Sequence, residues 1–491
     1  MPPQAPPDPR RWISLLVLLI ANFMNLIDVT IVNVALPAMR DGLGATDSQI
    51  EWVVAAYILA FALGLLPFGR LGDIVGRTTL FLWGVIAFTT ASALCGLSPN
   101  IEFLIVARIL QGLGGAMMTP QVLAIATVTF PPHERGQAFS LFGLSAGLAS
   151  VCGPIVGGVL ISAQLFGLDW QPIFLVNVPI GIAALVAGWF LIPRLPGNQE
   201  IRNDYVGIAL VGAGLLMIVF PIVEGRAFGW PAWTFAMIAA GILLMTGFVL
   251  WTRQRDKLGQ PQLLNHSLIT NRDFMFGALV TTVFASGIPG MFMVISILLQ
   301  GGFGFTPLES GLTNTPFSVG VLLASFIAGR FGSHYLRARL AASAALLIGG
   351  IGSLHFVMAG VTDIIDHWWF MVPLLVAGIG LGLGFSSLFQ LVLRNVPPRD
   401  AGSGSGALQA FQQVGGALGV AIVGEMFFGG VANGLANGAS QHAAFAKAAS
   451  FALWYQVASF ALVLLLVPLF RGPKGGQAAG HGAPQHMPIE V

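Results

Sequence analysis

The sequence predicts an all-α integral membrane protein with fourteen transmembrane helices. Its 491 residues are 56% hydrophobic and only 9% charged, whereas soluble domains carry about 25% charged residues. The net charge of +2 is too small to indicate nucleic acid as a partner. Fourteen apolar segments are long enough to cross a bilayer, and they lie at 12–37, 51–69, 78–97, 103–125, 136–161, 173–193, 205–224, 232–251, 273–298, 309–328, 338–360, 368–392, 402–426 and 449–470.

The distribution of basic residues predicts which ends of these segments face the cytoplasm. If residues 1–11 lie inside, only Arg40, Arg226 and Lys447 of the 22 lysines and arginines fall in outer loops, and Arg108 lies within a span. Positive charge concentrates in the cytoplasmic loops of membrane proteins. Both termini are therefore expected in the cytoplasm, which requires an even number of spans.

Two landmarks recur along the chain at nearly the same offset. GRLGDIVGRTTL from Gly69 returns as GRFGSHYLRARL from Gly329, and PPHERGQA from Pro131 returns as PPRDAGSG from Pro397. Equal order on the same side of the membrane indicates two parallel, duplicated halves, which is the plan of secondary transporters. The expected domains are a cytoplasmic lead at 1–11, a six-helix bundle at 12–193, a linker with two inserted helices at 194–251, a cytoplasmic loop at 252–272, a second six-helix bundle at 273–470 and a disordered cytoplasmic tail at 471–491.

Asp28 is the most unusual residue of the first apolar segment. A carboxylate at the centre of a membrane helix costs roughly 2.5–3.5 kcal/mol, which indicates a functional or paired group. At a rise of 1.5 Å per residue, Asp28 lies about 24 Å from the inner end of its helix, and Arg108 lies about 9 Å from the outer end of the fourth. The two charges are expected at similar depth, where they can meet or share a water. Burial favours the neutral form of Asp28 and Arg108 favours the ionised form, and the sequence does not decide between them.

The segment GRLGDIVGR, with Gly69, Gly72, Asp73, Gly76 and Arg77, resembles the signature between helices 2 and 3 of the major facilitator superfamily. The glycines predict a tight cytoplasmic turn, and the four-residue spacing of the acid and the arginine predicts a local ion pair. The resemblance implies a loop that latches the two halves together at the cytoplasmic side. A charged turn that only fixes topology is the alternative. Thr78 and, in the second copy, Ser333 depart from the family pattern.

Three segments, in helices 4, 5 and 1, resemble motifs of drug antiporters in the same superfamily. RILQGLGGAMM in helix 4 resembles the motif whose arginine, here Arg108, is linked to proton transfer; the alternative is a permanent hydrogen-bonding strut. GLSAGLASVCGPIVGGVL in helix 5 resembles the antiporter motif, with Ala149 as a departure and the matching residues Gly153, Pro154, Gly157 and Gly158. In helix 1, LIDVTIVNVALP resembles the fourteen-helix drug:proton antiporters, the EmrB/QacA-like branch.

This resemblance implies a major facilitator fold and a multidrug efflux transporter of the bacterial inner membrane. It would export lipophilic or amphipathic compounds in exchange for protons by alternating access, with Asp28 and Arg108 carrying the proton coupling. The partners implied are protons, drug-like molecules and the lipid bilayer; a periplasmic adaptor and outer-membrane channel are not readable from the sequence. The expected cavity residues are Asn25, Asn33, Gln111, Met117, Gln412 and Glu425.

The chain has no GxxxxGK[ST] loop, no HExxH and no nucleophile elbow, so we expect neither enzyme activity nor a metal or other cofactor. An ion gradient would then supply the energy. The alternatives are a proton-coupled solute symporter or a narrow-specificity metabolite exporter of the same fold, a lipid-modifying membrane enzyme, and a non-transporting sensor or scaffold. The helix 5 motif disfavours a symporter, and a membrane enzyme should show paired carboxylates or a metal cluster.

Overall fold

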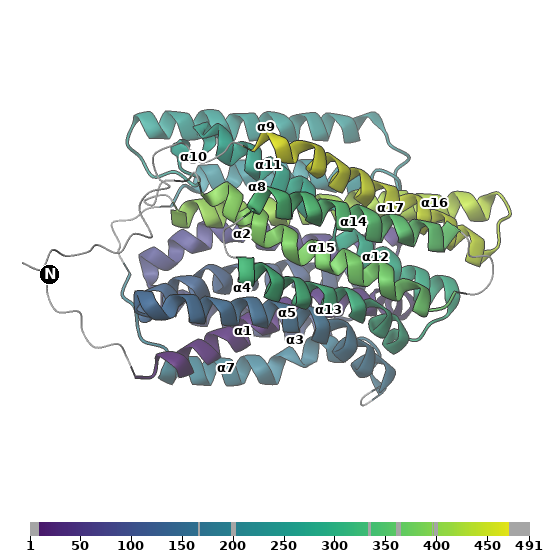
Figure 1. Cartoon of the computed structure of the whole chain (residues 1–491), viewed down its shortest axis with the longest axis horizontal. Helices are drawn as coiled ribbons and strands as arrows, with labels where there is room; N and C mark the ends of the chain where they lie inside the picture. Colours follow the sequence, from purple (N-terminus) through teal and green to yellow (C-terminus); the bar gives the residue numbers. More distant parts are fainter. Residues whose placement is uncertain are drawn as a thin grey trace, which may run out of the picture.

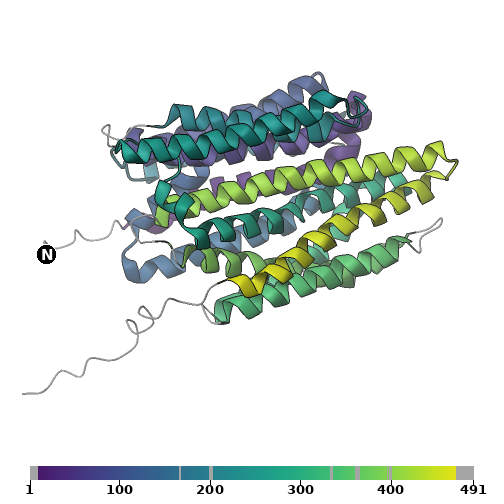
Figure 2. The same ribbon diagram turned by 90° about the horizontal axis from the view of Figure 1, so that it is seen from above.

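The computed structural model describes residues 9–164, 167–197, 203–331, 335–359, 365–394, 396 and 401–470. The expected tail at 471–491 and parts of both second-half repeats, at 332–334 and 397–400, lie outside these residues. Throughout the described part of the chain the regular secondary structure is helical. Figures 1 and 2 show the long helices running roughly along one common axis.

The first half of the chain folds as α1 (Arg11–Leu43), α2 (Asp47–Val75), α3 (Arg77–Gly96), α4 (Ile101–Thr129), α5 (Pro132–Ser162), α6 (Pro172–Leu175) and α7 (Asn177–Leu191). The inserted pair is α8 (Tyr205–Glu224) and α9 (Ala232–Lys257), followed by the short α10 (His266–Thr270). The second half contains α11 (Arg272–Ser286), α12 (Pro289–Ile297), the π-helical turn η2 (Leu298–Gly302), α13 (Pro307–Phe331), α14 (Leu336–Ala359), α15 (Trp368–Leu393), α16 (Ala401–Ala436), α17 (Gln441–Leu466) and the 3₁₀ turn η4 (Val467–Leu469).

Capping residues set the helix ends, so several helices extend beyond the apolar segments. Thr46 and Gln49 form a capping box at the start of α2, and the Asn100 side chain accepts a hydrogen bond from the Phe103 N–H at the start of α4. Such caps satisfy backbone donors that the first helical turn leaves free. Helix α2 therefore begins at Asp47 rather than at residue 51, and Glu51 lies inside it.

Twelve spans in the described residues are long and apolar enough to cross a membrane. Helices α5 and α13, whose side chains are described only in part, lie over the other two expected segments. The segment expected at 273–298 is broken rather than continuous, since Gly287 and Ile288 separate α11 from α12. Pro289 opens α12, a position where a proline's missing N–H costs nothing. The all-α membrane class is confirmed.

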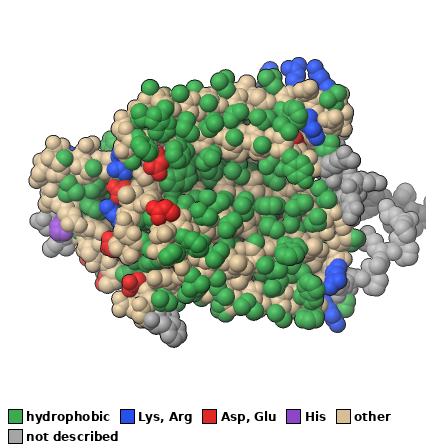
Figure 3. All heavy atoms as spheres, turned by 180° about the vertical axis from the view of Figure 1, so that it is seen from behind, with side chains coloured by type: hydrophobic (Ala, Val, Ile, Leu, Met, Phe, Trp, Pro, Cys, Tyr) green, Lys and Arg blue, Asp and Glu red, His purple; other side chains and the backbone are tan. Residues whose placement is uncertain are grey.

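The contacts between the two halves include the helix pairs α5 with α13, α2 with α16, α1 with α12 and α1 with α13. The inserted helices contact each other, and α8 also contacts both α2 and α16. We call the end where α1 leads into α2 the outer end, after the predicted topology, and the opposite end the inner end. In Figure 3, Lys and Arg side chains lie at one end, acidic side chains gather toward the other with some basic side chains among them, and hydrophobic side chains cover the surface between the two ends.

Candidate functional site

Asp28 of α1 and Arg108 of α4 form a buried ion pair between the two helices. The distance from Arg108 Nη1 to Asp28 Oδ2 is 2.6 Å. The side chain of Asp28 is 0% exposed and that of Arg108 is 1% exposed. The sequence predicts the two charges at similar depth, where they can meet or share a water, and in the structure they meet directly. A charged pair so far from water needs further hydrogen bonds to offset its desolvation.

Amide side chains supply the other hydrogen bonds of the carboxylate. Gln111 Nε2 donates to Asp28 Oδ1 over 2.7 Å, and Asn177 Nδ2 of α7 donates to the same oxygen over 3.2 Å. Both amides also donate to Ser92 Oγ of α3. Every partner of Asp28 is a donor, which is the environment of an ionised carboxylate.

Arg108 contacts four other groups besides Asp28. Its Nε donates to the carbonyl oxygen of Val53 over 3.1 Å, and its Nη1 donates to Gln111 Oε1 over 2.7 Å. The guanidinium carbon lies 4.1 Å from the ring centre of Tyr57 and 5.7 Å from that of Phe174. A desolvated cation on an aromatic face is attracted by the ring quadrupole. The guanidinium would therefore keep several partners if Asp28 were protonated.

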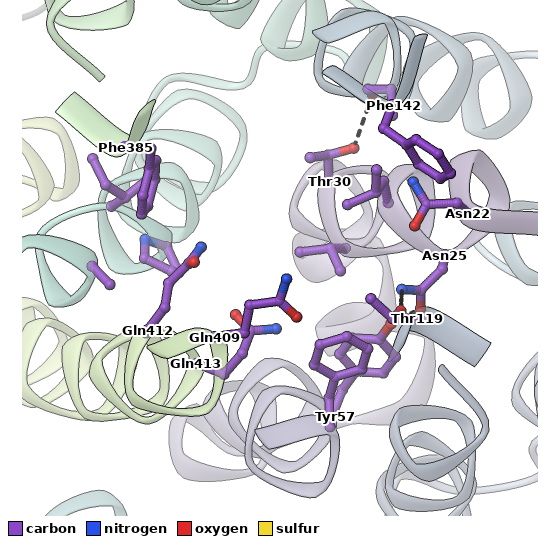
Figure 4. Close-up of a pocket in the computed structure, with 18 of the residues that line it drawn as sticks. Asn22, Asn25, Thr30, Tyr57, Thr119, Phe142, Phe385, Gln409, Gln412 and Gln413 are labelled. Carbon is purple, nitrogen blue, oxygen red and sulfur yellow. Dashed lines mark hydrogen bonds between the residues drawn. The ribbon is translucent and has the colours of Figure 1, made fainter. Parts of the chain in front are cut away.

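A short chain of hydrogen bonds leads from Tyr57 to the central cavity. Its hydroxyl donates to Asn25 Oδ1 over 2.6 Å, and Asn25 Nδ2 donates to Thr119 Oγ1 over 3.3 Å. Tyr57, Asn25 and Thr119 all line the cavity, whereas Asp28 and Arg108 do not. The ring of Tyr57 thus contacts Arg108 and also lines the cavity, so it separates the ion pair from the cavity. Figure 4 shows Tyr57 beside Asn25 and Thr119 in the cavity wall.

This cavity has a volume of about 450 Å³ and lies between the two halves, a size typical of small-molecule sites. In Figure 4, Asn22, Asn25, Thr30, Tyr57, Thr119 and Phe142 line one side, and Phe385, Gln409, Gln412 and Gln413 of α15 and α16 line the other. The described residues that line it include no Asp, Glu, Lys or Arg. The wall can form hydrogen bonds and aromatic contacts without offering a formal charge.

The cavity continues toward the inner end of the molecule. A second pocket shares Leu123 and Gln409 with it and reaches Arg70 and Asp73. At the outer end the halves are in contact, since Gln300 Nε2 donates to the carbonyl oxygen of Val34 over 2.9 Å. The cavity is therefore reached from the inner end in this conformation.

Only two of the six residues expected in the cavity line it, namely Asn25 and Gln412. Gln111 does not line the cavity, and its side chain donates a hydrogen bond to Asp28 instead. Asn33 Nδ2 donates to the carbonyl oxygen of Val29 in its own helix, and Met117 lies on the face of α4 nearest Gly84. Glu425 lies at the outer end, where its carboxylate is 3.3 Å from Arg226. Sequence spacing predicts depth in the membrane, but it does not predict which helix face turns toward the cavity.

The expected glycine-rich turn at the inner end is shorter than predicted. Gly69, Gly72 and Asp73 lie within α2, and Gly76 alone, with φ at +101°, separates α2 from α3. Gly72 instead allows close approach of the Gln121 side chain on α4. The predicted ion pair is confirmed, with 3.0 Å between Arg77 Nε and Asp73 Oδ1.

The glycines of α5 lie at contacts with two different helices. Gly153 and Gly157 face Thr30 and Ile31 of α1, and the Thr30 hydroxyl donates to the carbonyl oxygen of Ala149 over 3.3 Å. Gly158 instead faces α13 of the other half, and the carbonyl of Pro154 lies against Gly311 there. This motif therefore joins α1, the helix that carries Asp28, to the contact between the halves.

Gly158→Leu is expected to separate α5 from α13 at the outer end. A Cβ at position 158 would lie 2.6 Å from Leu308 Cα and 2.9 Å from the Pro307 oxygen, both backbone atoms. Overpacking of this kind costs about 1–3 kcal/mol, so thermal unfolding of the purified protein should occur at lower temperature. Gly349→Leu is the matched control, because a Cβ there meets no described atom within 4 Å. Equal stability of the two variants would contradict the close contact.

Tyr57→Phe is expected to destabilise the wall between cavity and ion pair. The change leaves the buried Asn25 Oδ1 without the hydroxyl that donates to it, which costs about 1–3 kcal/mol. Chemical unfolding followed by tryptophan fluorescence would measure the loss. Tyr205→Phe is the control, because Tyr205 is 74% exposed, and its effect should stay below about 0.5 kcal/mol.

Sequence reasoning missed Tyr57 and Asn177 in this site. Each is a polar residue within an apolar segment, and the chain has only four tyrosines. An interior tyrosine or amide in a membrane helix is a signal that could have pointed to them. Glu51 was also missed, because the expected span began at that residue.

Comparison with known proteins agrees with this architecture. The family profile of the Major Facilitator Superfamily matches residues 18–205 and 198–420. The "Probable actinorhodin transporter" of Streptomyces coelicolor is 40% identical over 425 residues, covering 86% of this chain and 74% of that protein. The "Methylenomycin A resistance protein" of Bacillus subtilis is 31% identical over 475 residues, covering 95% and 96%.

A solved structure shares the fold at low sequence identity. It is a bacterial homologue of the human lysosomal transporter Spinster, in an inward-facing and unoccupied conformation, with a TM-score of 0.64 and 18% identity over 95% of this chain and 100% of that one. With its multi-pass helical architecture and these matches, the chain belongs to the major facilitator superfamily of membrane transporters, not to an enzyme family.

Proposed function

We propose that this protein exports lipophilic or amphipathic compounds in exchange for protons across a bacterial inner membrane, with both termini in the cytoplasm. The observation that carries the proposal is the buried Asp28–Arg108 pair, separated from an uncharged cavity by Tyr57. Relatives with 30–40% identity are named as antibiotic transporters or resistance proteins, which supports export. A wall of aromatic, amide and hydroxyl groups suits bulky compounds with few charges.

In the proposed cycle, this conformation follows proton release to the cytoplasm. Asp28 is then ionised and accepts hydrogen bonds from Arg108, Gln111 and Asn177. A compound enters the cavity from the inner end, and the two halves rock so that the outer end opens.

A proton from the outer solution then binds a carboxylate oxygen of Asp28 and weakens its bond with Arg108. Arg108 lies on the Tyr57 ring, and the Tyr57 hydroxyl donates to Asn25 in the cavity wall. A shift of Arg108 is therefore transmitted through Tyr57 to the cavity wall, and the compound leaves. The halves rock back, and Asp28 releases its proton to the cytoplasm. One proton thus moves inward as one compound moves outward, while Asp28 itself need not touch the compound.

Proton flux in inverted membrane vesicles tests both the exchange and its direction. After an acid interior has been established, adding a transported compound should draw protons out of the vesicles and dissipate the gradient. A panel of toxic aromatic compounds would supply the candidates, and cells overproducing the protein should resist the same compounds only without an uncoupler. A symporter would give proton flux in the opposite sense, and a sensor or scaffold would give no compound-dependent flux.

A further inference from the structure

A second deeply buried carboxylate lies on α2 at the contact between the two halves, two residues before Val53, whose carbonyl oxygen accepts from Arg108. Glu51 is 1% exposed. Both of its carboxylate oxygens are buried, and in the part of the chain that the structure describes neither has a hydrogen-bond partner. An ionised carboxylate in such a place loses its hydration without replacement, which is far more costly than burying the neutral acid.

The surface that covers Glu51 belongs to the other half. A Cβ on Gly424 of α16 would lie 2.6 Å from Glu51 Oε2 and 2.7 Å from Oε1. The carboxyl group therefore fills the space that this glycine leaves free. Any motion that separates α2 from α16 at the outer end would expose Glu51 to water.

Three of the four charged groups that act on Glu51 are acids, and the fourth, Arg226, also contacts two of those acids. Asp47 of the same helix, Glu224 of α8 and Glu425 of α16 all act on it as like charges, and Arg226 is the opposing charge. Arg226 is already engaged, with its guanidinium 3.6 Å from Asp47 Oδ2 and 3.3 Å from Glu425 Oε2. Asp47 also pairs with Arg40 at 2.9 Å, and Glu224 accepts a hydrogen bond from Trp52 Nε1.

The inserted helices take part in the same contact. Arg226 follows α8 directly, and it joins Asp47 of the first half to Glu425 of the second. Trp230 Nε1, in the same turn, donates to Glu425 Oε1 over 3.4 Å. The turn between α8 and α9 therefore spans the outer contact beside Glu51. Its side chains contact Asp47 and Glu425, but in the described residues none of them forms a hydrogen bond with the Glu51 carboxylate.

We propose that Glu51 is a second proton-binding site, whose carboxyl group must be protonated for the outer end of the transporter to close. When the outer end opens, Glu51 meets water and releases its proton to the outer solution. When the outer end closes, a proton from that solution forms an O–H bond on the carboxylate, and the neutral acid packs against Gly424. The proton returns to the side from which it came, so this site adds none to the transport stoichiometry. The inference rests on the alternating access of the proposed function.

The linkage has a definite size and sign. If closure takes up one proton, the ratio of closed to open outer ends rises about tenfold for each unit fall in pH. This holds over the pH range in which Glu51 is protonated when the outer end is closed and ionised when it is open. Acid on the outer side thus favours the conformation seen here. Once Asp28 has released its proton to the cytoplasm, ionisation of Glu51 would favour reopening of the outer end.

Distance measurements between spin labels test this linkage without any transported compound. Labels on cysteines replacing Leu97 and Leu435, which are 70% and 47% exposed in the outer regions of the two halves, would be placed in full-length protein lacking Cys95 and Cys152, in lipid nanodiscs. Between about pH 5 and about pH 9, the long-distance population should grow with pH as the linkage requires. A wild-type distribution that does not change with pH would overturn the proposal.

Variants assign the response to Glu51. Glu51→Gln should keep the short distance at every pH, and Glu51→Asp should retain the pH response. Asp41→Asn, which neutralises an exposed acid near the same end, should behave like the wild type. If the label distances in Glu51→Gln changed with pH as they do in the wild type, Glu51 would not be the proton-binding site.

The Asp28→Asn background separates this site from the proposed coupling residue. If Glu51 binds a proton as proposed, the opening of the outer end should still depend on pH in Asp28→Asn and lose that dependence when Glu51→Gln is added. If Asp28→Asn alone removes all pH dependence, the Glu51 proposal fails while proton coupling through Asp28 stands. If the vesicle assay shows no proton exchange but the label distances still depend on pH through Glu51, the proposed function fails and the Glu51 proposal stands.

Discussion

Asp28→Asn is expected to abolish proton-driven export while leaving the protein folded. The asparagine keeps the shape of the side chain and an oxygen that can accept from Arg108, but it cannot take up and release a proton. Because Asp28 does not line the cavity, the variant should still bind transported compounds. We expect proton flux in vesicles to fall to the level of membranes that lack the protein, and resistance to disappear.

The matched control for this variant is Asp41→Asn, which removes an exposed carboxylate near the outer end of the same helix. It should export like the wild type. If Asp28→Asn exported compounds with undiminished dependence on the proton gradient, Asp28 could not be the coupling residue. The ion pair would then be a structural strut, the alternative that the sequence leaves open.

Arg108→Gln is expected to cause the largest loss of stability of any single change in the site. It leaves Asp28, which is 0% exposed, as a buried charge without its cation, and breaking a buried pair in this way costs about 3–5 kcal/mol. The double variant Asp28→Asn/Arg108→Gln should recover much of that loss, because no buried charge remains. The comparison requires unfolding curves of the wild type, both single variants and the double variant.

The surface variant Arg194→Gln provides the baseline for this series, and it should change stability by less than about 0.5 kcal/mol. Its side chain is exposed and lies over the Trp189 ring at the inner end of the first half. A double variant as unstable as the sum of the two single variants would show that Asp28 and Arg108 contribute independently. The pair would then not act as a unit.

The sequence predicts the central pair because membrane depth follows from a constant helical rise. Counting residues from each helix end places Asp28 and Arg108 at one level, and the structure brings them into contact. The Asp73–Arg77 pair is predicted from their four-residue spacing, and the structure contains it although Gly76 ends α2 between the two residues. Local periodicity and hydropathy thus suffice wherever a contact depends on distance along a helix axis.

Contacts that depend on rotation about the helix axis could not be predicted in this way. Met117 and Asn33 have suitable depth for the cavity but do not line it, whereas Tyr57 lines the cavity and contacts Arg108. Glu51 shows the same limit, because its position near a helix end predicts contact with water, yet Gly424 of the other half covers it. Which faces two helices present to each other is decided by packing among many side chains, not by either segment alone.

The break between α11 and α12 has a consequence for how the halves can move. Gly287 and Ile288 interrupt the backbone hydrogen bonds of this span, and Pro289 has no N–H to restore them. Helix α12 contacts both α1 of the first half and α16 of its own half, and α11 packs on α16 and α17. Bending at this joint sacrifices few helical hydrogen bonds, so α12 can change its angle to α11 when α1 moves relative to α16. Ile288 and Pro289 also line the cavity, so a bend at this joint changes the shape of the cavity wall.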